Sequence, residues 1–120
     1  MTAEHQKTGR FRLQETTIAD IQQAFADGSL TARQLVELYL NRIEAYDRNG
    51  PEINSIITVN PQALEDADRL DRDFGNNGLT GPLHGVPVIL KDQMDARGMP
   101  TTLGSVVFRD YFPDQDCFVT

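Results

Sequence analysis

The sequence has 120 residues, the usual size of one domain, and 39% of them are hydrophobic, a fraction too high for a disordered chain. Its 11 basic and 18 acidic residues give a formal charge of −7 without any basic cluster, which argues against direct binding to nucleic acid. No apolar run is long enough to span a bilayer, the N-terminus lacks a signal-peptide core, and the single cysteine cannot form an internal disulfide, so we expect a cytoplasmic protein with no membrane association.

Residues 1–15 are polar and mixed in charge, and we expect them to form an arm on the surface of a domain over residues 16–120. A helix is predicted to begin at Thr17, because its hydroxyl can accept a hydrogen bond from the backbone amide of Asp20. Apolar side chains then recur at helical spacing, and Gly28 is typical of a helix end.

A second helix is predicted over residues 31–48, since Thr-Ala-Arg-Gln forms a capping box at its start and Asn-Gly-Pro follows its end. Residues 53–59, INSIITV, are rich in β-branched side chains and predict a strand. A third helix is predicted over residues 61–74, after an Asn-Pro start signal. Its many charged side chains lie mainly off the apolar stripe, so we expect them to face solvent.

The sequence from residue 81 onward is rich in glycine and proline, and it holds one unbroken apolar run, VPVIL, at residues 86–90. Such a run predicts a strand that is buried on both faces. Strands that alternate with helices indicate an α/β fold, but two strands cannot complete a sheet that covers this run. The sequence therefore predicts an α/β arrangement whose sheet is incomplete within this chain.

Lys91 and Asp92 directly follow the apolar run. Open α/β sheets bind their ligands at the carboxyl ends of strands, so this position favours a functional lysine. A lysine that faces solvent, or one that pairs with Asp92 or Asp95, explains the same residues, because lysine side chains are mostly exposed. Position alone leaves both interpretations open.

Residues 81–105, GPLHGVPVILKDQMDARGMPTTLGS, closely resemble the first conserved block of the amidase-signature family. That block has a Gly-Pro-Leu-x-Gly-[Ile/Val]-Pro stretch, an apolar strand, Lys-Asp, and then a Thr-Thr-x-Gly-Ser loop. The preceding helices and strand are also similar to the family's N-terminal region, so the resemblance covers residues 17–120. It implies an α/β fold with helices around a mixed sheet, of which this chain is the N-terminal portion. One departure is Gln93, where many members have Asn.

In that family the catalytic groups are a nucleophilic serine, a second serine with a cis peptide bond, and a lysine, which the resemblance places at Lys91. The neutral lysine would take a proton from the nucleophile through the second serine. Both serines belong to a Gly/Ser-rich segment well beyond the motif, and no serine in residues 1–120 matches it. The resemblance thus implies an amidase that hydrolyses carboxylic or peptide amides through a Ser-cisSer-Lys triad, of which this chain holds only the lysine and is inactive alone. Supporting positions are implied for Asp92, Thr102, Gly104 and Ser105.

Two alternatives stay open. The same motif fits the amidase subunit of a tRNA-dependent amidotransferase, which applies this chemistry to glutamine, and a non-catalytic helical module derived from an amidase would also keep the capped helices. The resemblance implies a small-molecule or peptide amide as substrate and no cofactor or metal, and it does not indicate an oligomeric state. His84, in a glycine-rich turn with no acid or cysteine beside it, is interpreted as a structural histidine.

Overall fold

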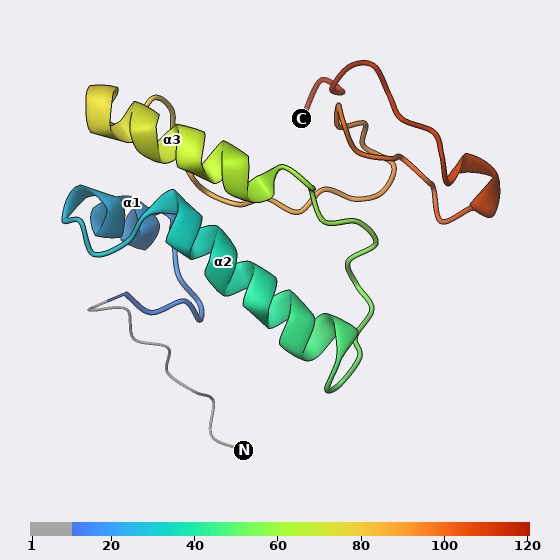
Figure 1. The fold of residues 1–120 in the computed structure, drawn as a ribbon, viewed down its shortest axis with the longest axis horizontal. Coiled ribbons are helices and arrows are strands. Elements are labelled where there is room, and N and C mark those ends of the chain that lie inside the picture. Colours follow the sequence, from blue (N-terminus) through green and yellow to red (C-terminus); the bar gives the residue numbers. More distant parts are fainter. Residues whose placement is uncertain (1–10) are drawn as a thin grey trace.

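The computed structural model describes residues 11–120; residues 1–10, most of the predicted polar arm, lie outside the described residues. Figure 1 shows the helices gathered on one side and residues 91–120, coloured orange to red, extending to the other. In this part of the chain no helix has the length and apolar character needed to cross a membrane. The elements are α1 (Ile18–Ala26), α2 (Ala32–Arg42), the π-helical turn η1 (Ile43–Arg48), α3 (Ala63–Asn77) and the 3-10 turn η2 (Val106–Phe108).

Both predicted N-terminal caps are confirmed. The Thr17 hydroxyl accepts from the amide of Asp20 at 3.1 Å, and the Asp20 carboxylate accepts from the amide of Thr17 at 3.0 Å. Thr31 and Gln34 form the same reciprocal pair at the start of α2, at 3.1 and 3.0 Å. Each pair satisfies two amides that the helix itself leaves without a partner, so these starts are set by residues three apart in sequence.

The third helix is longer than predicted. α3 passes through Gly75 and ends at Gly78, whose φ of 70° lies in the left-handed region. Both glycines are compatible with a helix end, but only Gly78 adopts the conformation that stops one. The predicted start is also shifted, because Asn60 accepts a hydrogen bond from the amide of Gln62 at 3.0 Å and α3 begins just after that turn.

α2 and α3 pack against each other, and α3 supplies a second cap to α2. The Asp71 carboxylate accepts from the backbone amides of Ala32 at 2.7 Å and Arg33 at 3.0 Å, in the first turn of α2. The Arg33 guanidinium in turn binds the Asp68 carboxylate at 2.6 Å. A negative charge at a helix N-terminus is favourable, so two carboxylates of the charged run expected to face solvent instead join the two helices.

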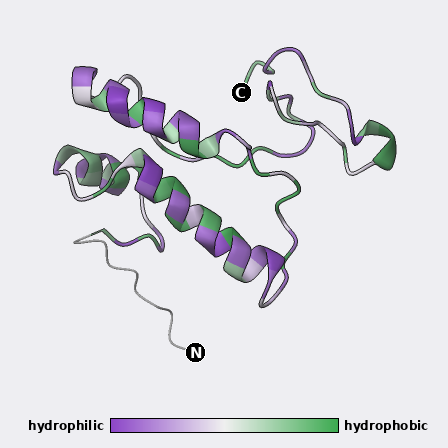
Figure 2. Cartoon of the chain, in the orientation of Figure 1, coloured by the Kyte–Doolittle hydropathy of each residue, from purple (hydrophilic) through white to green (hydrophobic). Residues whose placement is uncertain are grey.

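A small apolar core lies between the helices. Leu35 on α2 is completely buried, and Figure 2 shows hydrophobic and hydrophilic residues alternating along each helix. Phe11 is also buried and Leu13 packs against the same cluster, so residues at the end of the predicted arm contact the helices. The buried members of the core are Phe11, Ile21, Ala24, Phe25, Leu30, Ala32, Leu35, Leu38 and Ala67.

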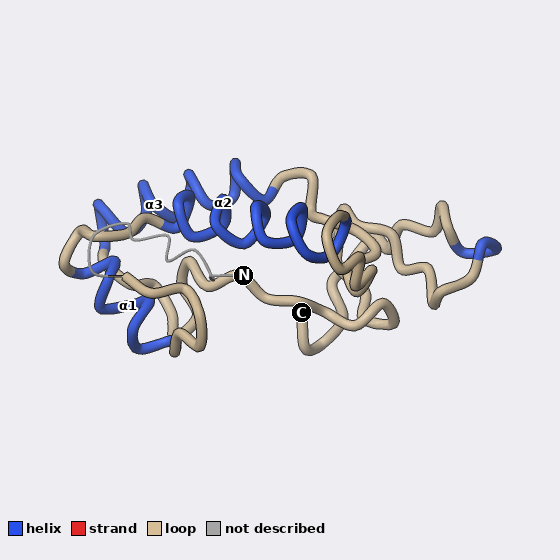
Figure 3. Tube along the Cα trace, turned by 90° about the horizontal axis from the view of Figure 1, so that it is seen from below, coloured by secondary structure: helices blue, strands red, loops and turns tan. Residues whose placement is uncertain are grey.

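The two predicted strands, at residues 53–59 and 86–90, are wrong for this structure: neither segment is a strand, and Figure 3 shows none among residues 11–120. A strand requires a partner along its edge, and neither segment has one here. As a result Ile53, Val88 and Ile89 are exposed by 63%, 62% and 79%. The predicted α/β sheet is therefore not seen, and the described chain is helical with extended loops.

Asp47, at the end of η1, binds the first of these extended segments. Its carboxylate accepts from the amide of Ser55 at 2.7 Å, from the Ser55 hydroxyl at 2.5 Å and from the amide of Ile56 at 3.2 Å. Only 4% of Asp47 is exposed, and the hydrogen bonds from the Ser55 hydroxyl and amide hold the pKa of its carboxyl below the ordinary value. A buried aspartate thus replaces a neighbouring strand as acceptor for this segment.

Replacing Asp71 by alanine removes the second cap of α2. We expect the free energy of unfolding to fall by about 1–2 kcal/mol, because two backbone amides lose a charged acceptor. Urea unfolding followed by circular dichroism measures the change. Asp73→Ala is the matched control: Asp73 is on the same helix and makes no hydrogen bond or ion pair with any described residue. Equal stability of the two variants would contradict the role of Asp71.

Acid should weaken the contact of Asp47 with residues 55–56. Because the pKa of this carboxyl is lowered on folding from its ordinary value of 3.8, its stabilising contribution is fully present above that value and is lost as the pH falls through the folded-state pKa. Between pH 5 and pH 3, approximately, stability should decline more steeply in the parent chain than in Asp47→Asn. Parallel slopes in the two proteins, measured by urea unfolding at each pH, would exclude this contribution.

Candidate functional site

The chain turns immediately after Lys91. The main-chain carbonyl of Lys91 accepts from the amides of Gln93 at 2.8 Å and Met94 at 2.9 Å, which closes a tight turn at the end of the extended segment 86–90. The chain then returns, so that residues 102–104 lie beside Asp92. This local fold brings together three of the residues that the family resemblance implied for the site: Asp92, Thr102 and Gly104.

Asp92 is the centre of this loop. Its carboxylate accepts from the Thr102 amide at 2.8 Å, from the Thr102 hydroxyl, and from the Gly104 amide at 3.2 Å. Its carbonyl oxygen accepts from the amide of Leu103 at 3.2 Å. The Thr102 hydroxyl, followed by the Thr102 amide, has the largest effect in lowering the pKa of the Asp92 carboxyl, and the nearby charge of Lys91 lowers it further. Asp92 is therefore a carboxylate at neutral pH.

Residues 103 and 104 adopt a conformation that allows these amides to converge. Leu103 has a φ of 53° and Gly104 a φ of 68°, both in the left-handed region. Glycine enters this region freely, whereas a leucine there costs about 1–2 kcal/mol. Because the Leu103 side chain is 57% exposed and fills no cavity, the hydrogen bonds to Asp92 are what offset this strain.

Ser105 has a structural contact rather than a catalytic one. Its amide donates to the carbonyl of Thr102 at 2.9 Å, and its hydroxyl accepts from the amide of Val107 at 3.3 Å, which caps η2. Among residues 11–120 no histidine, lysine or carboxylate forms a hydrogen bond with this hydroxyl. A serine needs a base to act as a nucleophile, so the geometry gives Ser105 a supporting place in the loop.

The side chain of Lys91 is exposed and forms no ion pair with any described residue. The interpretation that it pairs with Asp92 or Asp95 is therefore not supported. Both carboxylates have other partners, since Asp95 accepts from the Thr101 hydroxyl at 2.8 Å. The main chain at Lys91 is fixed by the turn, while its amine is free to meet a further group.

The rest of this region is tied back onto the same loop. The amide of Cys117 donates to the carbonyl of Asp95 at 2.9 Å, and the amide of Arg97 donates to the Asp116 carboxylate at 2.7 Å. The amide of Thr101 donates to the carbonyl of Tyr111 at 3.0 Å. These bonds connect the two ends of residues 91–117 without a hydrophobic core between them.

His84 lies apart from Lys91 and is 6% exposed. Its Nε2 is 2.9 Å from the carbonyl of Leu70, which can only accept, so Nε2 carries the proton and donates. Its Nδ1 then accepts from the Thr80 hydroxyl at 2.8 Å. Both ring nitrogens are occupied, which agrees with a structural histidine that joins the glycine-rich turn to α3. The described residues contain no group of three or more His, Cys, Asp or Glu side chains suited to a metal.

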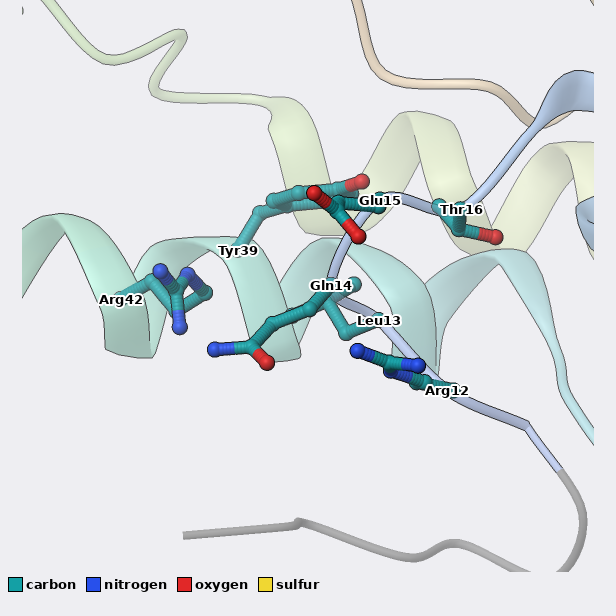
Figure 4. A pocket seen from close by; sticks show the side chains of 7 residues that line it. All are labelled: Arg12, Leu13, Gln14, Glu15, Thr16, Tyr39 and Arg42. Carbon is teal, nitrogen blue, oxygen red and sulfur yellow. The ribbon is translucent and has the colours of Figure 1, made fainter. Parts of the chain in front are cut away.

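A groove of about 580 Å³ lies elsewhere, between residues 12–16 and α2 (Figure 4). Arg12, Glu15, Tyr39 and Arg42 line it, and none of the implied site residues does. The Arg42 guanidinium stacks over the Tyr46 ring at 5.0 Å, so it already has a partner outside the groove. Nothing in its lining resembles the residues expected for amide hydrolysis.

Comparison with known proteins gives a consistent result. The sequence profile of the family described as Amidase matches residues 34–120. A probable amidase of Arabidopsis thaliana is 46% identical over 110 residues, which cover 83% of this chain and 21% of the relative. One component of the Glutamyl-tRNA(Gln) amidotransferase of Streptomyces coelicolor is 38% identical over 105 residues, with coverage of 87% and 20%. The chain thus spans about a fifth of the length of the curated relatives it matches.

Solved structures match as well. The native peptide amidase from Stenotrophomonas maltophilia is 41% identical, with a TM-score of 0.82, over 85% of this chain and 21% of that one. A peptide amidase in complex with the competitive inhibitor chymostatin has a TM-score of 0.84 at the same identity, over 88% and 22% of the two chains. The chain therefore has the backbone arrangement of the corresponding part of these proteins.

Proposed function

This chain belongs to the Amidase family, and on that premise we propose that it supplies Lys91 as the general base of an enzyme that hydrolyses carboxylic or peptide amides. The observation that carries the proposal is the state of the Lys91 side chain. It follows an ordered turn, it is exposed, and its two acidic neighbours are engaged by Thr102 and Thr101. A lysine that has to lose its proton functions best without a carboxylate partner.

The proposed reaction uses a Ser-cisSer-Lys triad. Neutral Lys91 takes a proton, through the bridging serine, from the nucleophilic serine, whose oxygen attacks the amide carbon. The protonated lysine returns the proton to the leaving amine, and water then releases the acyl group from the serine. Neither serine corresponds to Ser29, Ser55 or Ser105, so both are expected from sequence that the longer relatives possess and residues 1–120 lack.

The same relatives support a proposal for the fold. Residues 16–120 would form the N-terminal part of an amidase domain, in which residues 53–59 and 86–90 become strands of a mixed sheet once partner strands are present. The exposed side chains of Val88 and Ile89 are the observation in favour. Covering Lys91 with apolar groups of the remaining domain would favour its neutral amine, as the reaction requires.

A second candidate is the amidase subunit of a cytoplasmic tRNA-dependent amidotransferase, because one component of a Glutamyl-tRNA(Gln) amidotransferase is among the relatives. The two candidates share Lys91 and differ in substrate and partners. A stand-alone amidase releases ammonia from peptide amides by itself, whereas the amidotransferase component would require partner proteins and use glutamine. We favour the stand-alone enzyme, since the peptide amidases match the described backbone at 41% identity.

Lys91→Ala should abolish turnover in a chimera in which residues 16–120 of this chain replace the matching part of the Stenotrophomonas maltophilia peptide amidase. The expected loss in kcat is at least about 10⁴-fold, because proton transfer and the hydrogen bonds of both serines are lost together. Lys91→Arg should be no better, since a guanidinium stays charged. Ammonia release from an amidated dipeptide measures kcat, and circular dichroism confirms the fold.

Arg97→Ala is the control, because Arg97 is an exposed cation of the same loop and only its backbone amide has a partner among the described residues. It should leave kcat unchanged. Near-parental activity of Lys91→Ala would eliminate Lys91 as the base. A folded chimera that is inactive with Lys91 present would favour the non-catalytic helical module.

The 120-residue chain alone should release no ammonia above the buffer level from the same amide, because it lacks both serines of the triad. The assay uses purified chain at high concentration with the intact peptide amidase as positive control. Turnover that survives purification and disappears in Lys91→Ala would show that a nucleophile exists within these residues, and the triad proposal would then be abandoned.

A further inference from the structure

We propose that Asp92 is a positioning residue, which binds the turn at residues 102–104 so that the main chain of Lys91 is held in place while its amine keeps no carboxylate partner. The proposal rests on the proposed function, in which Lys91 is the base. It assigns to Asp92 and Thr102 a defined task, and it gives residues 102–104 a role other than contact with the substrate.

The evidence is the direction of the backbone amides. Three successive residues, Thr102 to Gly104, all donate to Asp92, two of them to its carboxylate and Leu103 to its carbonyl oxygen. The Thr102 hydroxyl is a further donor to the same carboxylate. A carboxylate has about four lone-pair sites, so three donors from one turn occupy most of them. The turn therefore competes directly with Lys91 for this charge.

That competition matters for a lysine base. An opposite charge within about 4–6 Å favours the protonated amine, and Asp92 is adjacent to Lys91 in sequence. Donors from residues 102–104 draw the carboxylate toward the turn, which leaves Lys91 exposed and without an ion pair to any described residue. The same contacts occupy the three amides, so this turn does not provide the donors that stabilise the oxyanion of an amide substrate.

The other charged groups of this loop have separate partners. The Asp95 carboxylate accepts from the Thr101 hydroxyl, and the Asp116 carboxylate accepts from the amide of Arg97. Thr101→Val thus removes a hydroxyl from a neighbouring carboxylate and leaves Asp92 untouched. It is a matched control for Thr102→Val, which removes the hydroxyl that binds Asp92.

The first experiment measures amide hydrogen exchange by NMR in the 120-residue chain, and it requires no activity. Thr102→Val should increase the exchange rate of the Gly104 amide about tenfold, because the carboxylate is no longer held toward the turn. Thr102→Ser, which keeps the hydroxyl, should restore slow exchange. Thr101→Val should leave this amide unchanged. Equal exchange at Gly104 in all four proteins would overturn the proposal.

The second experiment uses the chimera and the dependence of kcat/KM on pH. Thr102→Val frees the Asp92 carboxylate to hold the ammonium form of Lys91, so the rise in kcat/KM should move to higher pH and kcat at neutral pH should fall about tenfold, with KM within about twofold. Asp92→Asn removes the charge, so the rise should move to lower pH although the loosened turn lowers the maximum. Thr102→Ser should return the profile toward the parent.

Opposite shifts for Thr102→Val and Asp92→Asn are the decisive result, because general loosening of the loop would move both profiles together or neither. If Asp92→Asn fails to fold, the Thr102→Val and Thr102→Ser pair still decides. Lys91→Ala separates the two proposals. If it keeps activity, the proposed function fails, whereas an inactive Lys91→Ala with no shift in Thr102→Val overturns only the role of Asp92.

Discussion

An aspartate that accepts hydrogen bonds from backbone amides holds this chain together at three places. Asp71 binds the first turn of α2, Asp47 binds residues 55–56, and Asp92 binds residues 102–104. An ionised carboxylate is suited to this because it only accepts, and it can serve two or three amides at once. In a chain without strands among residues 11–120, these side chains satisfy amides that a sheet would otherwise satisfy.

The contrast between the two halves of the molecule explains why the site depends on such contacts. The helices enclose the buried apolar cluster, in which Leu35 is completely shielded. Residues 91–117 have no comparable core and are connected through Asp92, Asp95 and Asp116. Geometry near Lys91 is therefore set by directional hydrogen bonds. Such bonds define angles and positions more narrowly than apolar packing does, and this suits a residue that has to hand on a proton.

Sequence alone predicted the features that depend on near neighbours. The capping boxes at Thr17 and Thr31 need only residues three apart, and the amidase resemblance needs only the order of residues 81–105. The strands at 53–59 and 86–90 failed because β-branched composition describes one edge of a ladder and says nothing of its partner. The Asp71 cap was missed because its partners are 38 and 39 residues away, and no local pattern marks such a contact.

The separation between Asp92 and Thr102 is only ten residues, which bears on the order of folding. A loop of this length closes in about 10–100 ns, whereas a ribosome adds roughly 5–20 residues per second. The turn that presents Lys91 can therefore assemble as soon as Gly104 leaves the ribosome, before any later sequence has been made. In a longer amidase the base would then wait, already oriented, for the serines to arrive, so that the slow search of folding is confined to the sheet and not to the chemistry.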